Sequence, residues 1–230
     1  MAKLAHFARE EDTLQKHHYI AIEGVIGVGK TTLTRLAQPE FNAEILLEVF
    51  EENPFLARFY QDRKRYGFQT QIFFLLSRYQ QQHEVIPAVL TRGNLISDYT
   101  FDKNRIFARL NIEENELAMY ERVHNIVSTK IPTPDLIVYL RAETSVLMER
   151  IGLRDRSYER AIERDYIAAL GGAYDDFFAH YTAAPVLTID TNALDFVRRP
   201  EDLRAVLDRI RAKLELGAFQ KPLFNNGGGV

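Results

Sequence analysis

The chain has 230 residues, of which 46% are hydrophobic and 27% charged, with a formal net charge of −3 and no cysteine. This length suits one α/β domain with a sizeable core. The slightly acidic balance argues against nucleic acid or a membrane surface as partner, and the lack of cysteine excludes disulfides and thiolate chemistry and fits a cytoplasmic location.

The two ends of the sequence differ in composition from the apolar runs between them. Residues 1–17 lack the apolar stretch of a secretory signal and predict a short N-terminal arm, with a capping helix as the alternative. Residues 218–230 predict a flexible tail. Because no linker or internal repeat divides the sequence, we expect residues 1–230 to form a single domain.

Five short apolar runs have the composition of β-strands, at residues 19–23, 44–49, 94–98, 135–140 and 185–190. Helix-forming stretches lie between and after them, at residues 30–38, 53–61, 67–84, 101–109, 113–129, 143–152, 158–181 and 200–216. Apolar strands that alternate with helices are typical of an α/β fold whose parallel sheet is covered on both faces.

A complete phosphate-binding motif, G-x-x-x-x-G-K-[ST], follows the first predicted strand. It consists of Gly24, Val25, Ile26, Gly27, Val28, Gly29, Lys30 and Thr31, with Thr32 next in the predicted helix. Glycines allow the backbone N–H groups to turn toward phosphates, and the helix N-terminus adds positive potential. Lys30 is expected to reach the β- and γ-phosphates and Thr31 to ligate Mg²⁺. The motif therefore predicts ATP and Mg²⁺ as cofactors.

The phosphate-binding loop alone does not choose among P-loop enzymes. A GTPase is disfavoured because no Asn-Lys-x-Asp guanine clamp is present, and the length leaves little room for the accessory domains of a motor ATPase. A small-molecule kinase is favoured. Two alternatives stay open: a kinase for nucleoside monophosphates or another metabolite, and a nucleotide-binding switch that needs no acceptor.

Further segments resemble the deoxynucleoside kinase family, particularly bacterial deoxyguanosine and deoxyadenosine kinases. They are residues 22–31, 48–56, 71–78, 98–104, 150–156 and 187–190. The resemblance covers roughly residues 19–212. It implies a P-loop kinase fold with a five-stranded parallel sheet, ATP-dependent 5′-phosphorylation of a purine deoxynucleoside in nucleotide salvage, and a homodimer formed through residues 67–84 and 113–129.

Glu48 is the candidate catalytic base. It lies at the predicted C-terminal end of the second strand, on the edge where ligands bind in open α/β sheets. A carboxylate there can accept the proton of a 5′-hydroxyl. Glu51 and Glu52 compete for the role, and an acidic turn before Asn53 is the alternative. The catalytic glutamate of the family falls on Glu48.

Asp98 follows the third predicted strand, where a carboxylate can hold Mg²⁺ directly or through water. In most of the family Arg-Ser comes next, whereas Tyr99 and Thr100 stand here. Lys103 is the candidate to replace that arginine. The resemblance associates this departure with deoxyguanosine kinases and so favours guanine, although Asn104, at the position that contacts the base, could serve either purine.

Besides Glu48, Asp98, Lys103 and Asn104, four further residues are candidates for nucleoside binding. Gln71 and Arg78 lie seven residues apart, on one face of a predicted helix, and offer a polar pair to a base. A solvent-facing side that includes Gln80, Gln81 and Gln82 is the alternative. In the family, Tyr60 and Glu159 hold the 3′-hydroxyl, but Tyr60 could equally be a core tyrosine.

Arginines gather after the fourth strand, at Arg150, Arg154 and Arg156. Arg150 and Arg154 repel each other at helical i, i+4 spacing unless an anion lies between them. A solvated charged face is the alternative, but with a phosphate-binding loop upstream the pattern favours a lid over ATP. We expect Arg154 and Arg156 to contact phosphate in catalysis and Arg150 to assist in ATP binding.

Overall fold

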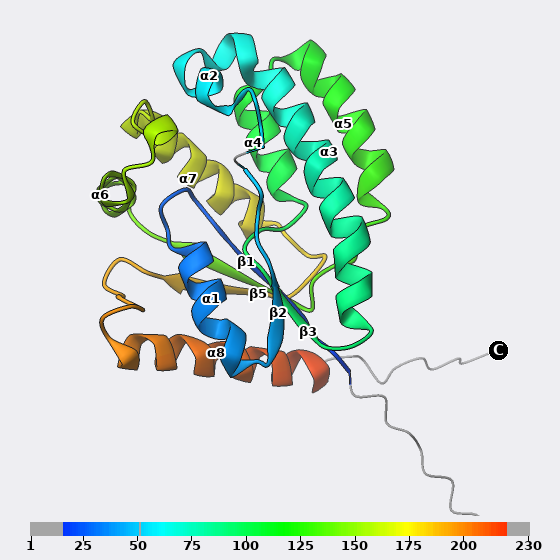
Figure 1. Ribbon diagram of the computed structural model, residues 1–230, viewed down its shortest axis with the longest axis vertical. Coiled ribbons are helices and arrows are strands. Elements are labelled where there is room, and N and C mark those ends of the chain that lie inside the picture. Colours follow the sequence, from blue (N-terminus) through cyan, green and yellow to red (C-terminus); the bar gives the residue numbers. More distant parts are fainter. Residues whose placement is uncertain (1–15, 51, 220–230) are drawn as a thin grey trace, which may run out of the picture.

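The computed structural model describes residues 16–50 and 52–219 and contains a five-stranded, all-parallel sheet (Figure 1). The strands are β1 (Tyr19–Gly24), β2 (Ala43–Leu46), β3 (Asn94–Ser97), β4 (Leu136–Arg141) and β5 (Val186–Asp190), in the order β2-β3-β1-β4-β5. The predicted sheet is therefore confirmed. Glu51, most of the predicted N-terminal arm and most of the predicted tail lie outside the described residues.

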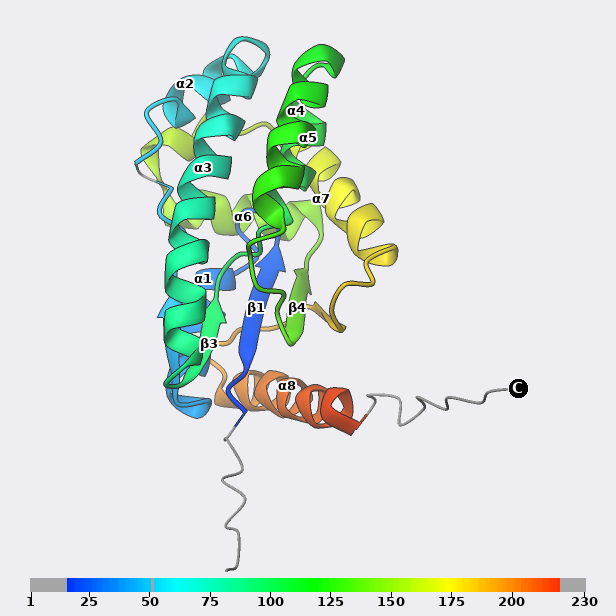
Figure 2. The same ribbon diagram turned by 90° about the vertical axis from the view of Figure 1, so that its right-hand side faces the viewer.

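Helices cover both faces of the sheet. They are α1 (Lys30–Glu40), α2 (Leu56–Gln61), α3 (Arg63–Leu90), α4 (Lys103–Asn111), α5 (Glu114–Ser128), α6 (Thr144–Arg154), α7 (Arg164–Ala179) and α8 (Pro200–Phe219). Figure 1 shows α1 and α8 on one side and α3, α4 and α7 on the other, and Figure 2 shows α3 and α5 side by side.

The burial of each strand follows its place in the sheet. Every residue of β1 is buried, as are the first five residues of β4, because these strands are covered on both faces. The edge strands β2 and β5 are only partly buried. Because the strands are parallel, the carboxyl ends of β1, β2 and β3 meet at one edge of the sheet. The phosphate-binding loop, Glu48 and Asp98 lie at this edge.

The predicted helix 67–84 is longer at both ends, as α3, whereas the second predicted strand ends early and the helix after it begins late. The second strand stops at Leu46, whose carbonyl accepts the last ladder bond, from Asp98 N at 3.2 Å. Glu48 therefore lies two residues beyond the sheet instead of inside the predicted strand 44–49. Helix 53–61 begins only at Leu56, because Asn53 Oδ1 accepts from Phe55 N at 3.0 Å and forms a turn.

The predicted helix over residues 158–181 is wrong at its start. The chain forms a single 3₁₀ turn, η1 (Ser157–Glu159), and α7 begins at Arg164. Glu159 is buried and faces Arg154, with 2.6 Å between Oε1 and Nη2. This contact requires the chain to turn back toward α6, which a continuous helix would prevent.

No helix within residues 16–50 and 52–219 has both the length and the apolar character that crossing a membrane requires.

Candidate active site

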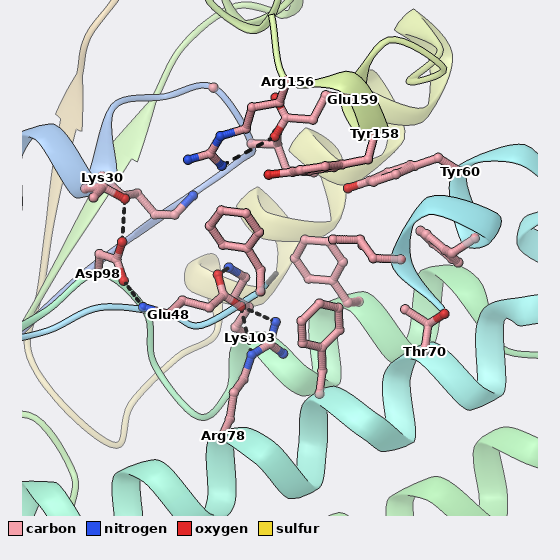
Figure 3. A pocket seen from close by; sticks show the side chains of 18 of the residues that line it. Lys30, Glu48, Tyr60, Thr70, Arg78, Asp98, Lys103, Arg156, Tyr158 and Glu159 are labelled. Carbon is pink, nitrogen blue, oxygen red and sulfur yellow. Dashed lines mark hydrogen bonds and ion pairs between the residues drawn. The ribbon is translucent and has the colours of Figure 1, made fainter. Parts of the chain in front are cut away.

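A cavity opens at the carboxyl edge of the sheet, between the phosphate-binding loop, α3 and the segment after α6 (Figure 3). Its polar lining brings together residues from these elements, from α2 and α4, and from the ends of β2 and β3. They are Lys30, Thr31, Glu48, Tyr60, Thr70, Gln71, Arg78, Asp98, Lys103, Arg154, Arg156, Tyr158 and Glu159. Most of the side chains proposed from the sequence for catalysis and nucleoside binding thus share one cavity.

The phosphate-binding loop has the backbone that its glycines allow. Gly24 and Gly29 have φ values of 147° and 105°, which side-chain-bearing residues rarely adopt. A Cβ atom at Gly24 would lie 2.4 Å from the Leu140 carbonyl oxygen. Lys30 Nζ lies inside the loop and donates to the carbonyls of Gly24 at 2.7 Å and Val25 at 3.1 Å. The lysine that should meet phosphate is therefore already directed into the loop.

Burial is the main cause that lowers the pKa of Lys30, to about 8, and repulsion from Lys103 adds to it. Attraction to Glu23, Glu48 and Asp98 opposes the shift without cancelling it. An anion placed beside Nζ would restore the charged form, because opposite charges at short range favour ionisation. The electrostatics of the loop therefore suit a phosphate.

Thr31 and Asp98 form an oxygen-rich pair between the loop and β3. The Thr31 hydroxyl donates to Asp98 Oδ2, and Asp98 Oδ1 accepts from the Glu48 N–H at 2.8 Å. Hydroxyl and carboxylate oxygens are ligands that suit Mg²⁺. Within the described part of the chain, no group of three or more His, Asp or Glu side chains could hold a metal by itself. Any Mg²⁺ here needs further oxygens, of the kind that nucleotide phosphates and water supply.

Glu48 is held between two cations. Lys103 Nζ lies 2.5 Å from Oε2, and Arg78 donates to Oε1 through Nη2 and through Nε at 2.9 Å. The Glu48 side chain is only 12% exposed. Burial alone would raise its pKa, but the charges and hydrogen bonds of Lys103 and Arg78 prevail and hold the pKa well below its usual range. Glu48 is therefore an ionised carboxylate inside the cavity.

Of the two competitors of Glu48, Glu52 can be placed. It is exposed and does not line the cavity, whereas Glu51 falls outside the described residues. The alternative of a solvated acidic turn therefore does not apply to Glu48, whose side chain faces buried cations.

The wall formed by α3 and α4 combines the aromatic rings of Phe74 and Phe107 with polar side chains that include Gln71 and Arg78. Gln71 and Arg78 are buried, so the alternative of a solvent-facing side does not hold for them. Asn104 lies behind Arg78 and does not line the cavity: its Oδ1 accepts from Arg78 Nη1 at 2.5 Å. A direct contact between Asn104 and a base stays a prediction.

The three arginines predicted to form a lid are engaged with protein groups. Arg154 forms a two-pronged ion pair with Glu159, and Arg156 stacks over Phe50 with 4.4 Å between its central carbon and the ring centroid. Arg150 does not line the cavity; it donates to Thr191 O at 2.7 Å and, more weakly, to the carbonyl of Val28 in the phosphate-binding loop at 3.4 Å. The structure thus brings Arg154 and Arg156 to the cavity, whereas Arg150 joins α6 to the segment after β5. Thr32 is also not among the residues that line it.

Three functional candidates were not found from the sequence. Glu23 is fully buried and accepts from the N–H groups of Gly24 at 3.0 Å and Thr100 at 2.6 Å, so it joins the phosphate-binding loop to the segment after β3. A charged residue in an apolar strand was an available signal. Thr70 and Tyr158 line the cavity with hydroxyls that have no hydrogen-bond partner among the described residues, and nothing in the sequence singled them out.

Comparison with known proteins gives a consistent result. A family model described as "Deoxynucleoside kinase" matches residues 20–215. "Deoxyguanosine kinase" of Bacillus subtilis (strain 168) is 33% identical over 198 residues, which cover 84% of this chain and 96% of that protein. "Deoxyadenosine kinase" of Dictyostelium discoideum is 35% identical over 219 residues, which cover 91% of this chain and 86% of that protein.

The fold has a counterpart of known structure. A deoxyadenosine kinase from M. mycoides, solved with bound dATP, aligns with a TM-score of 0.74 at 27% sequence identity. The alignment covers 85% of this chain and 100% of that one.

Proposed function

The chain belongs to the deoxynucleoside kinase family, and we propose that it uses ATP to phosphorylate the 5′-hydroxyl of a purine deoxynucleoside, deoxyguanosine in preference to deoxyadenosine. The observation that carries the proposal is the position of Glu48. It is an ionised carboxylate held by Lys103 and Arg78 in the same cavity that Lys30 enters from the phosphate-binding loop.

The proposed reaction is an in-line displacement. The 5′-oxygen of the nucleoside attacks the γ-phosphorus, the bond from that phosphorus to the β–γ bridging oxygen breaks, and ADP leaves. Glu48 accepts a hydrogen bond from the attacking hydroxyl and then its proton. Because its pKa is low, Glu48 is a weak base, so we expect it chiefly to orient the hydroxyl and to take the proton late.

Positive groups of the chain would stabilise the charge on the transferring phosphoryl group. Lys30, Arg154 and Arg156 all line the cavity. To reach phosphate, Arg156 would have to leave the face of Phe50. Mg²⁺, held by Thr31 and Asp98 together with the nucleotide, would neutralise phosphate charge.

The nucleoside would lie along α3. Tyr60 and Glu159 are the proposed partners of the 3′-hydroxyl. Glu159 already accepts from Arg154, but a carboxylate has about four acceptor positions and can bind both. Gln71 Oε1 is buried without a protein partner among the described residues, and a base edge would satisfy it.

The preference for guanine is supported by Arg78. Its bonds to Glu48 and Asn104 leave N–H donors of the guanidinium unused. Guanine offers the acceptors O6 and N7 to such donors, whereas adenine presents an amino group in place of O6. The relatives do not decide between the purines, since one is named a deoxyguanosine kinase and the other a deoxyadenosine kinase.

The deciding experiment measures ADP release with no acceptor and with deoxyguanosine, deoxyadenosine, deoxycytidine and thymidine in turn. We expect turnover only with an acceptor and the highest kcat/KM with deoxyguanosine. A preference for a nucleoside monophosphate would support the alternative kinase. Turnover that needs no acceptor would support a nucleotide switch. Highest kcat/KM with deoxyadenosine would overturn the guanine preference but leave the reaction type intact.

A homodimer through α3 and α5 is part of the proposal. Three large apolar side chains are exposed on this pair of helices: Leu76 at 49%, Met119 at 57% and Ile126 at 69%. Exposed apolar groups on neighbouring helices are typical of an interface. The cytoplasmic location and the single-domain organisation over residues 1–230 stay predictions from the sequence.

A further inference from the structure

The peptide group between Leu47 and Glu48 is held from both sides. Its N–H donates to Asp98 Oδ1 at 2.8 Å, a bond drawn in Figure 3. Its carbonyl, on Leu47, accepts from Gln81 Nε2 at 3.1 Å. This peptide lies just beyond the end of β2, where the ladder no longer fixes the backbone. The side chains of Asp98 and Gln81 thus fix the backbone at Glu48 in place of the sheet hydrogen bonds.

The orientation of the Gln81 amide is itself fixed. The Tyr99 hydroxyl donates to Gln81 Oε1, so the amide nitrogen faces the Leu47 carbonyl. Tyr99 is fully buried, and burial raises the pKa of its phenol far above the ordinary value. The hydroxyl therefore keeps its proton and can act as a donor at any pH at which the protein folds.

Tyr99 is connected to the Leu47–Glu48 peptide both along the chain and through Gln81. It directly follows Asp98, the residue that holds the other side of the same peptide, and its carbonyl accepts from Ser97 Oγ at 2.8 Å. The segment Ser97–Tyr99 thus reaches the Leu47–Glu48 peptide twice, once through Asp98 and once through the Tyr99–Gln81 pair. Neither Tyr99 nor Gln81 lines the cavity, so neither meets a ligand there.

We propose that Tyr99 and Gln81 are positioning residues that set the direction of the Glu48 carboxylate by fixing the plane of the Leu47–Glu48 peptide. This inference rests on the proposed function of Glu48. In this proposal Lys103 supplies the positive charge beside Glu48. Tyr99 acts separately, because it fixes the backbone at Glu48 through Gln81.

Two nearly isosteric substitutions test the proposal. Tyr99→Phe removes the hydroxyl that orients the amide. Gln81→Glu keeps an acceptor for Tyr99 but turns an oxygen toward the Leu47 carbonyl. We expect each to lower kcat about 3- to 20-fold, the effect of one or two hydrogen bonds on the transition state. KM for ATP and for deoxyguanosine should stay within about twofold, because neither residue touches a ligand. Gln80→Glu, an exposed neighbour on α3, is the control and should change nothing.

The double variants separate positioning from general damage. If Tyr99 acts through Gln81, Tyr99→Phe should add little further loss in the Gln81→Glu background. In the Glu48→Gln background neither substitution should lower kcat further, since no carboxylate is left to direct. A purely structural role would instead lower thermal stability and reduce activity equally in every background.

The outcomes are distinguishable from failure of the proposed function. If wild type shows no acceptor-dependent turnover, or if Glu48→Gln turns over normally, the assignment of Glu48 fails. If Glu48→Gln is impaired while folded Tyr99→Phe and Gln81→Glu keep wild-type kcat, only the positioning role is overturned. The same holds if their losses are additive with Glu48→Gln. Should Tyr99→Phe fail to fold, Gln81→Glu alone decides between these results.

Discussion

Lys103 and Glu48 stand 55 positions apart in the chain, yet 2.5 Å separates Nζ of the lysine from Oε2 of the glutamate. The Lys103 side chain is 7% exposed, so the pair lies in a poorly solvated place, where the attraction between opposite charges is strong. The resemblance noted in the sequence leads us to expect an arginine at position 99, where this chain has Tyr99. In this chain the beginning of α4 supplies the cation, four residues further along.

Replacing Lys103 by methionine should weaken the reaction and change its pH dependence. Loss of the ammonium leaves Glu48 with Arg78 alone, so the pKa of Glu48 should rise, and the acid limb of the kcat profile should move to higher pH. We expect kcat to fall about 10- to 100-fold. Lys103→Arg, which keeps the charge, should retain more activity. Unchanged kcat and pH profile in Lys103→Met would refute the role of Lys103.

Glu48→Gln should lower kcat by about 100-fold or more and leave nucleoside binding largely intact, because the amide can neither take the proton nor pair with two cations. Steady-state kinetics and nucleoside titration would measure both effects. Glu52→Gln is the matched control, since Glu52 is exposed and away from the cavity. Near-normal turnover in Glu48→Gln would show that another group is the base.

The pKa of about 8 for Lys30 predicts a decline in kcat/KM for ATP at alkaline pH. Below this pH the ammonium is charged and attracts phosphate, and above it the neutral amine predominates, so the fall should approach about tenfold per pH unit. At saturating ATP, kcat should hold to higher pH, because bound phosphate favours the charged form. The exposed Lys64 offers a control, Lys64→Met, which should leave the profile unchanged. A flat profile to pH 9.5 would contradict the prediction.

Thr70→Val should raise thermal stability and weaken nucleoside binding together. The Thr70 hydroxyl is buried without a partner among the described residues, which costs about 1–3 kcal/mol, and valine removes it at equal volume. If the nucleoside satisfies this hydroxyl, KM for deoxyguanosine should rise about 3- to 10-fold while KM for ATP stays constant. Thr70→Ser should keep the wild-type KM. A gain in stability with unchanged KM would mean that the hydroxyl does not meet the substrate.

Charge placed on the exposed face of α5 should dissociate the proposed dimer. Ile126→Glu and Met119→Glu each bury a carboxylate if the interface forms, which is strongly unfavourable. Light scattering coupled to size-exclusion chromatography should then report a monomer where wild type is a dimer. Val197→Glu makes the same change at a residue that is 73% exposed but lies before α8, and it should leave the mass unchanged. A monomeric wild-type protein would contradict the proposed homodimer.

The phosphate-binding loop and the sheet were accessible from sequence because their determinants are local. Closely spaced glycines followed by Lys30 and Thr31 define the loop backbone and its charge, and apolar runs of strand length define β1, β3, β4 and β5 to within a residue or two. The family match over residues 20–215 agrees with the segments quoted from the sequence. The early end of β2 and the 3₁₀ turn before α7 were missed because both depend on partners distant in the chain or on a side-chain ion pair.

Which side chains serve Glu48 was decided only by tertiary structure. The sequence predicted Lys103 as a substitute cation, but not that Arg78 would bind the same carboxylate from α3, 30 positions away. Gln81 belongs to a run of glutamines that also suits a solvent-facing side of a helix. In the structure its amide nitrogen donates to the Leu47 carbonyl. The physical reason is that a motif specifies its own backbone, whereas the face that a helix turns toward a cavity is chosen by packing of the whole core.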